Sequence, residues 1–343
     1  MKKIILVLLL LIIIGAGIFA WFILGSGTAF SEKNRYLYIG TGKATKDAVM
    51  DSLRTNNLLS SPGMFEWVAN RLKVWDKVKP GRFEIKKGQS VLGIARMIRN
   101  NQQSPVNFTI LKLRVKEDLA KLIDRYFETD STRVMSFLNN PDSLARLDVD
   151  SNTLMTIVIP NTYTLLWTTP VNKILGRLKT EQQAFWKKNG RREKAEQQGL
   201  TPLQVYTIAS IVEEETNKND EKGNIASVYI NRLDKGMPLG ADPTVKFALK
   251  DFALKRIYHK HLDVASPYNT YRNTGLPPGP ICTPSPKTID EVLKAPKTDY
   301  LFFVARSDFS GYHTFASNFA DHRKYAAEYQ RALDEYMQRK QKP

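Results

Sequence analysis

Three consecutive glutamates at the end of an apolar run are the residues whose type and spacing point most directly to chemistry. They stand in the stretch SIVEEETNKND, residues 210–220. A carboxyl group in apolar surroundings has a raised pKa and keeps its proton near neutral pH, as a general acid must. A run of acidic residues is more often a solvated helix end. The position of each glutamate therefore decides between a proton donor and a surface charge.

A single helix is predicted to carry the three glutamates. Thr201-Pro202 is typical of an N-cap followed by a first helical residue, which predicts a helix over 201–217. At 3.6 residues per turn, one side of this helix gathers an apolar stripe. The stripe consists of Val205, Ile208, Ile211 and Val212.

The three glutamates fall on different sides of the predicted helix. Glu215 lies within the apolar stripe, Glu214 lies on a mostly polar stripe, and Glu213 lies on a flank between them. The pattern therefore predicts that Glu215 faces the core. A frayed last turn that returns Glu215 to solvent remains an open alternative.

The composition is that of a folded protein with an excess of positive charge. The chain has 343 residues, 42% of them hydrophobic and 25% charged, and Lys and Arg together number 51 against 34 for Asp and Glu. A net charge of +17 favours anionic partners such as phospholipid headgroups, nucleic acid or an acidic polymer. The single cysteine, Cys282, excludes an internal disulfide.

The N-terminus predicts a membrane anchor. Residues 4–24 form an unbroken apolar run of about the length that a helix needs to cross a bilayer. Lys2 and Lys3 precede the run and predict a cytoplasmic stub at 1–3, because positive residues stay on the cytoplasmic side. The rest of the chain is then extracytoplasmic, on a single-pass protein of the inner (plasma) membrane. This location excludes nucleic acid as a partner.

The chain downstream is predicted to be α+β and to contain two folded parts. Residues 25–35 are interpreted as a polar linker and 36–110 as a small module of strands and helices. The turn at 88–90, Gly-Gln-Ser, opens a short helix and resembles the LysM glycan-binding module. A larger mixed α+β domain is predicted over 111–340, including a helix over 113–147, a strand over 156–163 and a helix over 171–190.

Several sequence blocks in the larger domain resemble one known family. In order along the chain they are ASIVEEET (209–216), IASVYINRL (225–233), DPTV (242–245), PYNTY (267–271), GLPPGPI (275–281), YLFFV (300–304) and GYHTF (311–315). His322 follows them. Together these blocks resemble the YceG-like family of endolytic murein transglycosylases.

The resemblance implies one catalytic glutamate in the first block. Lytic transglycosylases commonly follow that residue with a hydroxyl residue, and Glu215-Thr216 is the pair that qualifies, with Glu213 as the second choice. The implied reaction cleaves the bond between N-acetylmuramic acid and N-acetylglucosamine without water and leaves 1,6-anhydro ends. The implied partners are peptidoglycan strands and peptidoglycan synthases. No cofactor or metal is expected, and His259 and His261 are interpreted as a surface pair.

The family blocks also supply candidate substrate contacts. These are Asn231, Asp242, Tyr268, Asn269, Thr270, Tyr271 and His313. The tyrosines are suited to stacking on sugars and the amides to hydrogen-bonding them, whereas buried structural roles are the alternative for each residue. Asp242 in particular is either a loop residue that begins a helix or a second catalytic acid.

Two other functions remain open at this point. With Asp242 as a second acid the protein would be a lysozyme-like muramidase, and without any reaction it would be a cell-wall-binding scaffold. The chain also departs from the family pattern, with Leu111-Lys112 where Glu-Gly is common, Asn161 in a Pro-Asp-Thr-Tyr type of turn, and Gly240-Ala241 where glutamine is frequent. These departures concern the substrate subsites.

Overall fold

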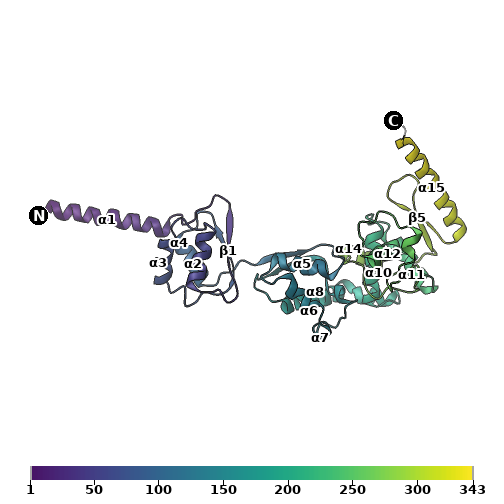
Figure 1. The fold of residues 1–343 in the computed structure, drawn as a ribbon, viewed down its shortest axis with the longest axis horizontal. Helices are drawn as coiled ribbons and strands as arrows, with labels where there is room; N and C mark the ends of the chain where they lie inside the picture. Colours follow the sequence, from purple (N-terminus) through teal and green to yellow (C-terminus); the bar gives the residue numbers. More distant parts are fainter. Residues whose placement is uncertain (1, 342–343) are drawn as a thin grey trace. The chain divides into compact units, whose positions relative to one another are not determined.

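The computed structural model describes residues 2–341, and within them the chain divides into two compact units (Figure 1). The first unit comprises the chain up to Phe108 together with 123–130 and 163–170. The second comprises 109–122, 131–162 and 171 onward.

The first element is the apolar helix α1, Lys2–Leu24, drawn in purple in Figure 1. Its segment Lys3–Trp21 is long and apolar enough to cross a membrane, and none of it is buried in the protein. The helix therefore fits a single membrane-spanning anchor.

The first unit has a two-stranded antiparallel sheet with two helices between its strands. Leu37 lies opposite Phe83 in this sheet, and both side chains are buried. Helix α4 follows the second strand, where Ser90 accepts a hydrogen bond from the Gly93 amide as the predicted N-cap. The elements are β1 (Asn34–Ile39), α2 (Lys46–Thr55), α3 (Pro62–Arg71), β2 (Gly81–Lys86) and α4 (Val91–Arg99).

The predicted linker over 25–35 is wrong, because this segment is part of the first unit. Isolated β-bridges join Ser26 to Ser90 and Thr28 to Leu59. The Thr28 hydroxyl accepts a 2.9 Å hydrogen bond from the Gly88 amide, and Phe30 is only 9% exposed within the core. The sequence does not predict these contacts, because the segment is short and polar and pairs with residues that are distant in the sequence.

Two later segments complete the first unit, which therefore extends beyond the predicted module at 36–110. The Glu128 carboxylate accepts hydrogen bonds from the backbone and hydroxyl of Thr41. The rings of Tyr38 and Trp167 meet edge to face at 5.0 Å between centroids. The strands and helices of the first unit agree with the prediction of a module of strands and helices. Its resemblance to the LysM module stays a prediction.

The second unit is mainly helical. Strands β5 (Phe302–Ala305) and β6 (His313–Ala316) form an antiparallel pair in it. Strands β3 (Val106–Ile110) and β4 (Asn161–Leu165) also pair with each other, and the division of the chain into units falls within both of these strands. The helices from α5 to α9 are α5 (Lys116–Tyr126), α6 (Ser131–Leu138), α7 (Pro141–Ala145), α8 (Val171–Lys187) and α9 (Arg191–Gln197). The later helices are α10 (Pro202–Glu215), α11 (Lys222–Asp234), α12 (Asp242–Leu249), α13 (His259–Leu262), α14 (Pro286–Leu293) and α15 (Phe319–Gln341).

Two sequence predictions for the larger domain are corrected by this element order. The helix predicted over 113–147 is three helices, and the last break falls at Asn140-Pro141, where proline disfavours helical backbone in the residue before it. The strand predicted over 156–163 begins with a 3-10 turn, Leu154–Ile157, and β4 starts only at Asn161. The Tyr206 hydroxyl, donating to the carbonyls of Met155 and Val158, holds this turn.

Helix α10 is the central helix of the second unit. Every residue from Val205 to Val212 is buried, including the polar Thr207 and Ser210. The Ser210 hydroxyl accepts a 3.0 Å hydrogen bond from the Ile281 amide. The sequence pattern indicates a polar stripe on this helix but not its burial, which arises because α11, α12 and α14 pack against α10.

Candidate functional site

The local sequence fixes both ends of the helix that presents the glutamates. At its start the Thr201 hydroxyl and the Gln204 side chain form a reciprocal capping box. At its end Thr216 adopts extended backbone, so α10 stops at Glu215 rather than at 217 as predicted. The three glutamates therefore occupy the last turn, where each side chain leaves the helix in a different direction.

Glu215 is a protonatable carboxyl group enclosed by protein. The Tyr229 hydroxyl, on α11, donates a 2.6 Å hydrogen bond to its Oε1. Burial raises the pKa of Glu215 to about 7, against the lowering effect of the Tyr229 hydrogen bond. The residue keeps a partly exposed surface. A group that holds a proton near neutral pH and remains accessible has the properties of a general acid.

Asp242 and Tyr271 form a hydrogen-bonded pair close enough to Glu215 to interact with its charge. Asp242 is exposed at the start of α12 and accepts a 2.7 Å hydrogen bond from the Tyr271 hydroxyl. Its negative charge contributes to the raised pKa of Glu215, whereas the positive charge of Lys246, also on α12, opposes it. Burial and the neighbouring Asp242 raise the pKa of Tyr271 above its ordinary value. The site thus contains two carboxyl groups in different environments.

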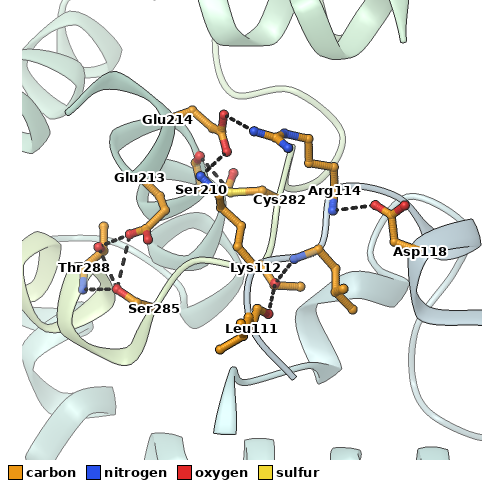
Figure 2. Close-up of polar contacts among 12 residues, drawn as sticks. Leu111, Lys112, Arg114, Asp118, Ser210, Glu213, Glu214, Cys282, Ser285 and Thr288 are labelled. Carbon is orange, nitrogen blue, oxygen red and sulfur yellow. Dashed lines mark hydrogen bonds and ion pairs between the residues drawn. The ribbon is translucent and has the colours of Figure 1, made fainter. Parts of the chain in front are cut away.

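Glu214 forms ion pairs with two cationic side chains (Figure 2). The Lys112 ammonium lies 2.8 Å and the Arg114 guanidinium 3.0 Å from its carboxylate oxygens. Although burial alone would raise the pKa of Glu214, the hydrogen bonds from Lys112 and Arg114 lower it. An ionised carboxylate held in this way is a poor proton donor.

Glu213 points away from Glu214 and enters a buried polar cluster (Figure 2). Its carboxylate accepts hydrogen bonds from Ser285 and Thr288 on the α14 side and from the Lys222 ammonium at 3.1 Å. Lys222 is 5% exposed and also donates to Thr288. Glu213 therefore neutralises a buried cation, which is a structural role.

A second network begins at Thr216, directly after Glu215. The Thr216 hydroxyl donates a 2.6 Å hydrogen bond to Glu221, and the same carboxylate binds the backbone amide and Nδ1 of His313. Glu221 is 4% exposed. The network ties the end of α10 to β6 and fixes the backbone that follows Glu215. His313 is thus a hydrogen-bonded histidine within this network.

Two of the other predicted substrate contacts, Asn269 and Thr270, have structural roles. Asn269 is fully buried and donates to the carbonyls of Leu262 and Val264, and Thr270, 1% exposed, bonds the Ala241 amide. These two side chains offer no surface to a ligand, which corrects the expectation that they contact sugar. They hold the backbone that carries Tyr271.

Asn231 and Tyr268 are also occupied by contacts within the protein. The Asn231 amide donates to the carbonyls of Thr298 and Tyr300. The ring of Tyr268 lies 4.7 Å from that of Phe247, and burial raises the pKa of its hydroxyl to about 12. Both residues remain partly exposed, and their predicted contact with substrate stays a prediction.

Sequence reasoning missed two residues of the site. Tyr229 lies in one of the family blocks, but nothing in its spacing indicates that its hydroxyl meets Glu215. Lys246 follows Asp242 by four residues, and this i,i+4 spacing on one helix face was the signal that could have found it.

Fold and site together define a mixed α+β protein with one N-terminal apolar helix and a single enclosed, proton-holding glutamate at a helix end. The chain belongs to the YceG-like family, whose sequence profile matches residues 37–328. A crystal structure of a yceG-like protein from Listeria monocytogenes has a similar fold, with a TM-score of 0.58 over 86% of this chain and 99% of that one at 24% identity.

Two curated relatives match a shorter stretch. A protein of Bacillus subtilis (strain 168) named endolytic murein transglycosylase is 43% identical over 128 residues, which are 36% of this chain and 34% of that protein. A protein of the same name from Streptococcus pneumoniae serotype 2 (strain D39) is 36% identical over 134 residues, 38% of this chain and 24% of that protein. The matched stretch thus spans about a third or less of the length of these relatives.

Proposed function

We propose that the protein is an endolytic lytic transglycosylase that cleaves peptidoglycan strands between N-acetylmuramic acid and N-acetylglucosamine. The observation that carries this proposal is the enclosed carboxyl group of Glu215, with its pKa of about 7 and its single tyrosine hydrogen bond. The family membership and the names of the two curated relatives support the same substrate.

Glu215 serves as acid and then as base in the proposed reaction. Its proton passes to the oxygen of the glycosidic bond, and this bond breaks through an oxocarbenium-like state. The resulting carboxylate takes the proton from the C6 hydroxyl of the muramyl residue, whose oxygen bonds to C1. The products are a 1,6-anhydro end and a free N-acetylglucosamine end, and water is not consumed. Because the substrate supplies the nucleophile, one carboxyl group suffices.

The contacts around Glu215 suit both steps. Burial favours the protonated form that begins the reaction, and the Tyr229 hydrogen bond stabilises the carboxylate that forms in the middle of it. Tyr271 is 39% exposed and bonded to Asp242, which supports its proposed role of stacking on a sugar ring.

The apolar helix α1 supports a location at a membrane. We propose that α1 is retained as a single-pass anchor of the plasma membrane with residues 1–3 in the cytoplasm, which places the site outside the membrane near newly made strands. The first unit is then suited to hold or orient glycan, as its LysM-like turn suggests. Synthases that make the strands are the proposed protein partners.

A muramidase is the second candidate, and Asp242 is the observation that favours it. Its carboxylate is close enough to raise the pKa of Glu215, so a water molecule between the two acids would give hydrolysis instead of ring closure. Product analysis on purified sacculi decides the matter. New anhydro ends establish a transglycosylase, new reducing ends a muramidase, and no new ends a non-enzymatic scaffold, which would overturn the proposal.

A further inference from the structure

A small cationic pocket lies beside the glutamate cluster. It has a volume of about 140 Å³ and is lined by two cations, one carboxylate and apolar side chains. The lining residues are Arg114, Glu214, Pro243, Lys246, Phe252 and Ile281. At roughly 30 Å³ for each water molecule, the pocket has room for a carboxylate group.

The two cations of the pocket differ in their partners. Arg114 is paired with Glu214 at 3.0 Å and lies over the Phe252 ring at 5.1 Å, so it is fixed in place. No hydrogen bond or ion pair within residues 2–341 holds the Lys246 ammonium. The ammonium of Lys246 is partly exposed and is therefore available to an anion from outside the chain.

Lys246 is also close to the reacting end of the site. It follows Asp242 by four residues on α12, so the two side chains share a helix face. Its charge acts on the carboxyl group of Glu215. An anion bound at Lys246 would therefore belong to the sugar at the cleaved bond or to a group attached to it.

We propose that this pocket binds a carboxylate of the peptidoglycan strand, with Lys246 as its principal contact and Arg114 beside it. The inference rests on the proposed function and deepens it by naming a determinant of substrate choice. Two groups of the strand carry this chemistry: the acidic residues of the peptide stem, and the lactyl carboxylate that is exposed when the stem is removed. Either would lie near the muramyl residue that Glu215 acts on.

Equilibrium binding tests the pocket without depending on the reaction. Strands are titrated against Glu215→Gln protein with and without Lys246→Gln, using stem-bearing strands, stem-stripped strands and strands whose carboxylates are methylamidated. A charge-assisted hydrogen bond predicts that Lys246→Gln raises Kd about ten-fold or more on a strand with the recognised carboxylate. On methylamidated strands Lys246→Gln should change Kd by less than about two-fold.

Two control variants distinguish recognition of the carboxylate from the loss of any positive charge and from a folding defect. Lys287→Gln removes an exposed lysine of α14 and should leave Kd within about two-fold, whereas Lys246→Arg should retain most of the binding. An effect confined to stem-bearing strands identifies the stem carboxylate, and one confined to stripped strands identifies the lactyl group. The proposal is overturned if Lys246→Gln leaves Kd unchanged on both native strands, or raises it equally on methylamidated strands.

Kinetics with the unsubstituted glutamate complete the test. Lys246→Gln should raise KM on the recognised strand by a larger factor than it changes kcat, as loss of a binding contact does. Lys246 also lowers the pKa of Glu215, so Lys246→Gln changes the acid as well as the pocket. Methylamidated strands have no carboxylate for the pocket to bind, and any change in rate on them therefore reports the change in the acid alone. If the protein binds as expected yet releases no anhydro ends, the proposed reaction fails and the pocket stands.

Discussion

The hydroxyl of Tyr229 donates a 2.6 Å hydrogen bond to Oε1 of Glu215, and this pair joins the last residue of α10 to the middle of α11 in the second unit. Burial favours the neutral carboxyl group, whereas the tyrosine favours the carboxylate. The balance of these two effects leaves Glu215 able to give and to take a proton near pH 7.

Replacing Glu215 by Gln should abolish the reaction and preserve the fold. Glutamine keeps the shape and the acceptor for Tyr229 but has no proton to transfer. We expect the release of anhydro-muropeptides to fall by at least roughly 10²–10⁴-fold, because the same group acts as acid and base. Glu214→Gln is the comparison one residue away, and it should retain most of kcat, since Glu214 is paired with Lys112 and Arg114 and is not the proton donor. Loss of activity in the control alone would reassign the acid.

Replacing Glu213 by Gln should lower stability more than either neighbouring change. The substitution leaves the Lys222 ammonium, 5% exposed, without a countercharge. We expect a loss of about 3 kcal/mol in the free energy of unfolding, measured by denaturant titration. Lys222→Met in the same background should recover part of this loss. An unchanged midpoint in Glu213→Gln would contradict the structural role given to this carboxylate.

The pH dependence of kcat/KM should report the pKa of Glu215. The protonated acid begins the reaction, so activity should decline as pH rises through about 7. Tyr229→Phe removes a hydrogen bond that lowers this pKa, and the alkaline limb should therefore move to higher pH. Asp242→Asn removes a charge that raises it, and the limb should move to lower pH. Shifts of both variants in the same direction would contradict the assignment.

The stability of the protein should show the same titration with no substrate present. The pKa of Glu215 is raised from 4.5 to about 7 on folding, so its stabilising effect is complete below pH 4.5 and is lost as pH rises through 7. Glu215→Gln lacks this titration. We expect the variant to gain stability relative to the parent between pH 4.5 and 7, by on the order of 3 kcal/mol at the upper end. Parallel curves from thermal unfolding across this range would refute the raised pKa.

Removal of the anchor should leave the chemistry intact, provided that the cut respects the first unit. A chain that starts at Gly25 keeps the bridge of Thr28 to Leu59 and the buried ring of Phe30. A chain that starts at Ser31 loses both, and its first unit should unfold at a lower temperature by several degrees, since loss of a buried phenylalanine costs about 3 kcal/mol. Both proteins should still cut isolated strands. Equal melting temperatures would restore the linker interpretation of this segment.

Local sequence determined the helix that bears the site. The Thr201-Pro202 start and the apolar run after it follow from short-range patterns, because capping and helical periodicity involve residues a few positions apart. Periodicity together with the family resemblance favoured Glu215 among the three glutamates, and its catalytic role stays a prediction. The blocks that place the chain in its family are local as well. That α1 is long and apolar enough to cross a membrane also follows from its length and hydrophobicity alone.

Only the tertiary structure decided what surrounds each glutamate. Glu213 meets Thr288 and Lys222, Glu214 meets Lys112, and Glu215 meets Tyr229, and no periodicity relates these partners to the helix they pack against. The burial of Thr207 and Ser210 on α10 could not be predicted for the same reason, since it depends on helices that arrive from distant parts of the chain. A pKa near 7 is the sum of those distant contacts, and it therefore arises only when the chain has folded.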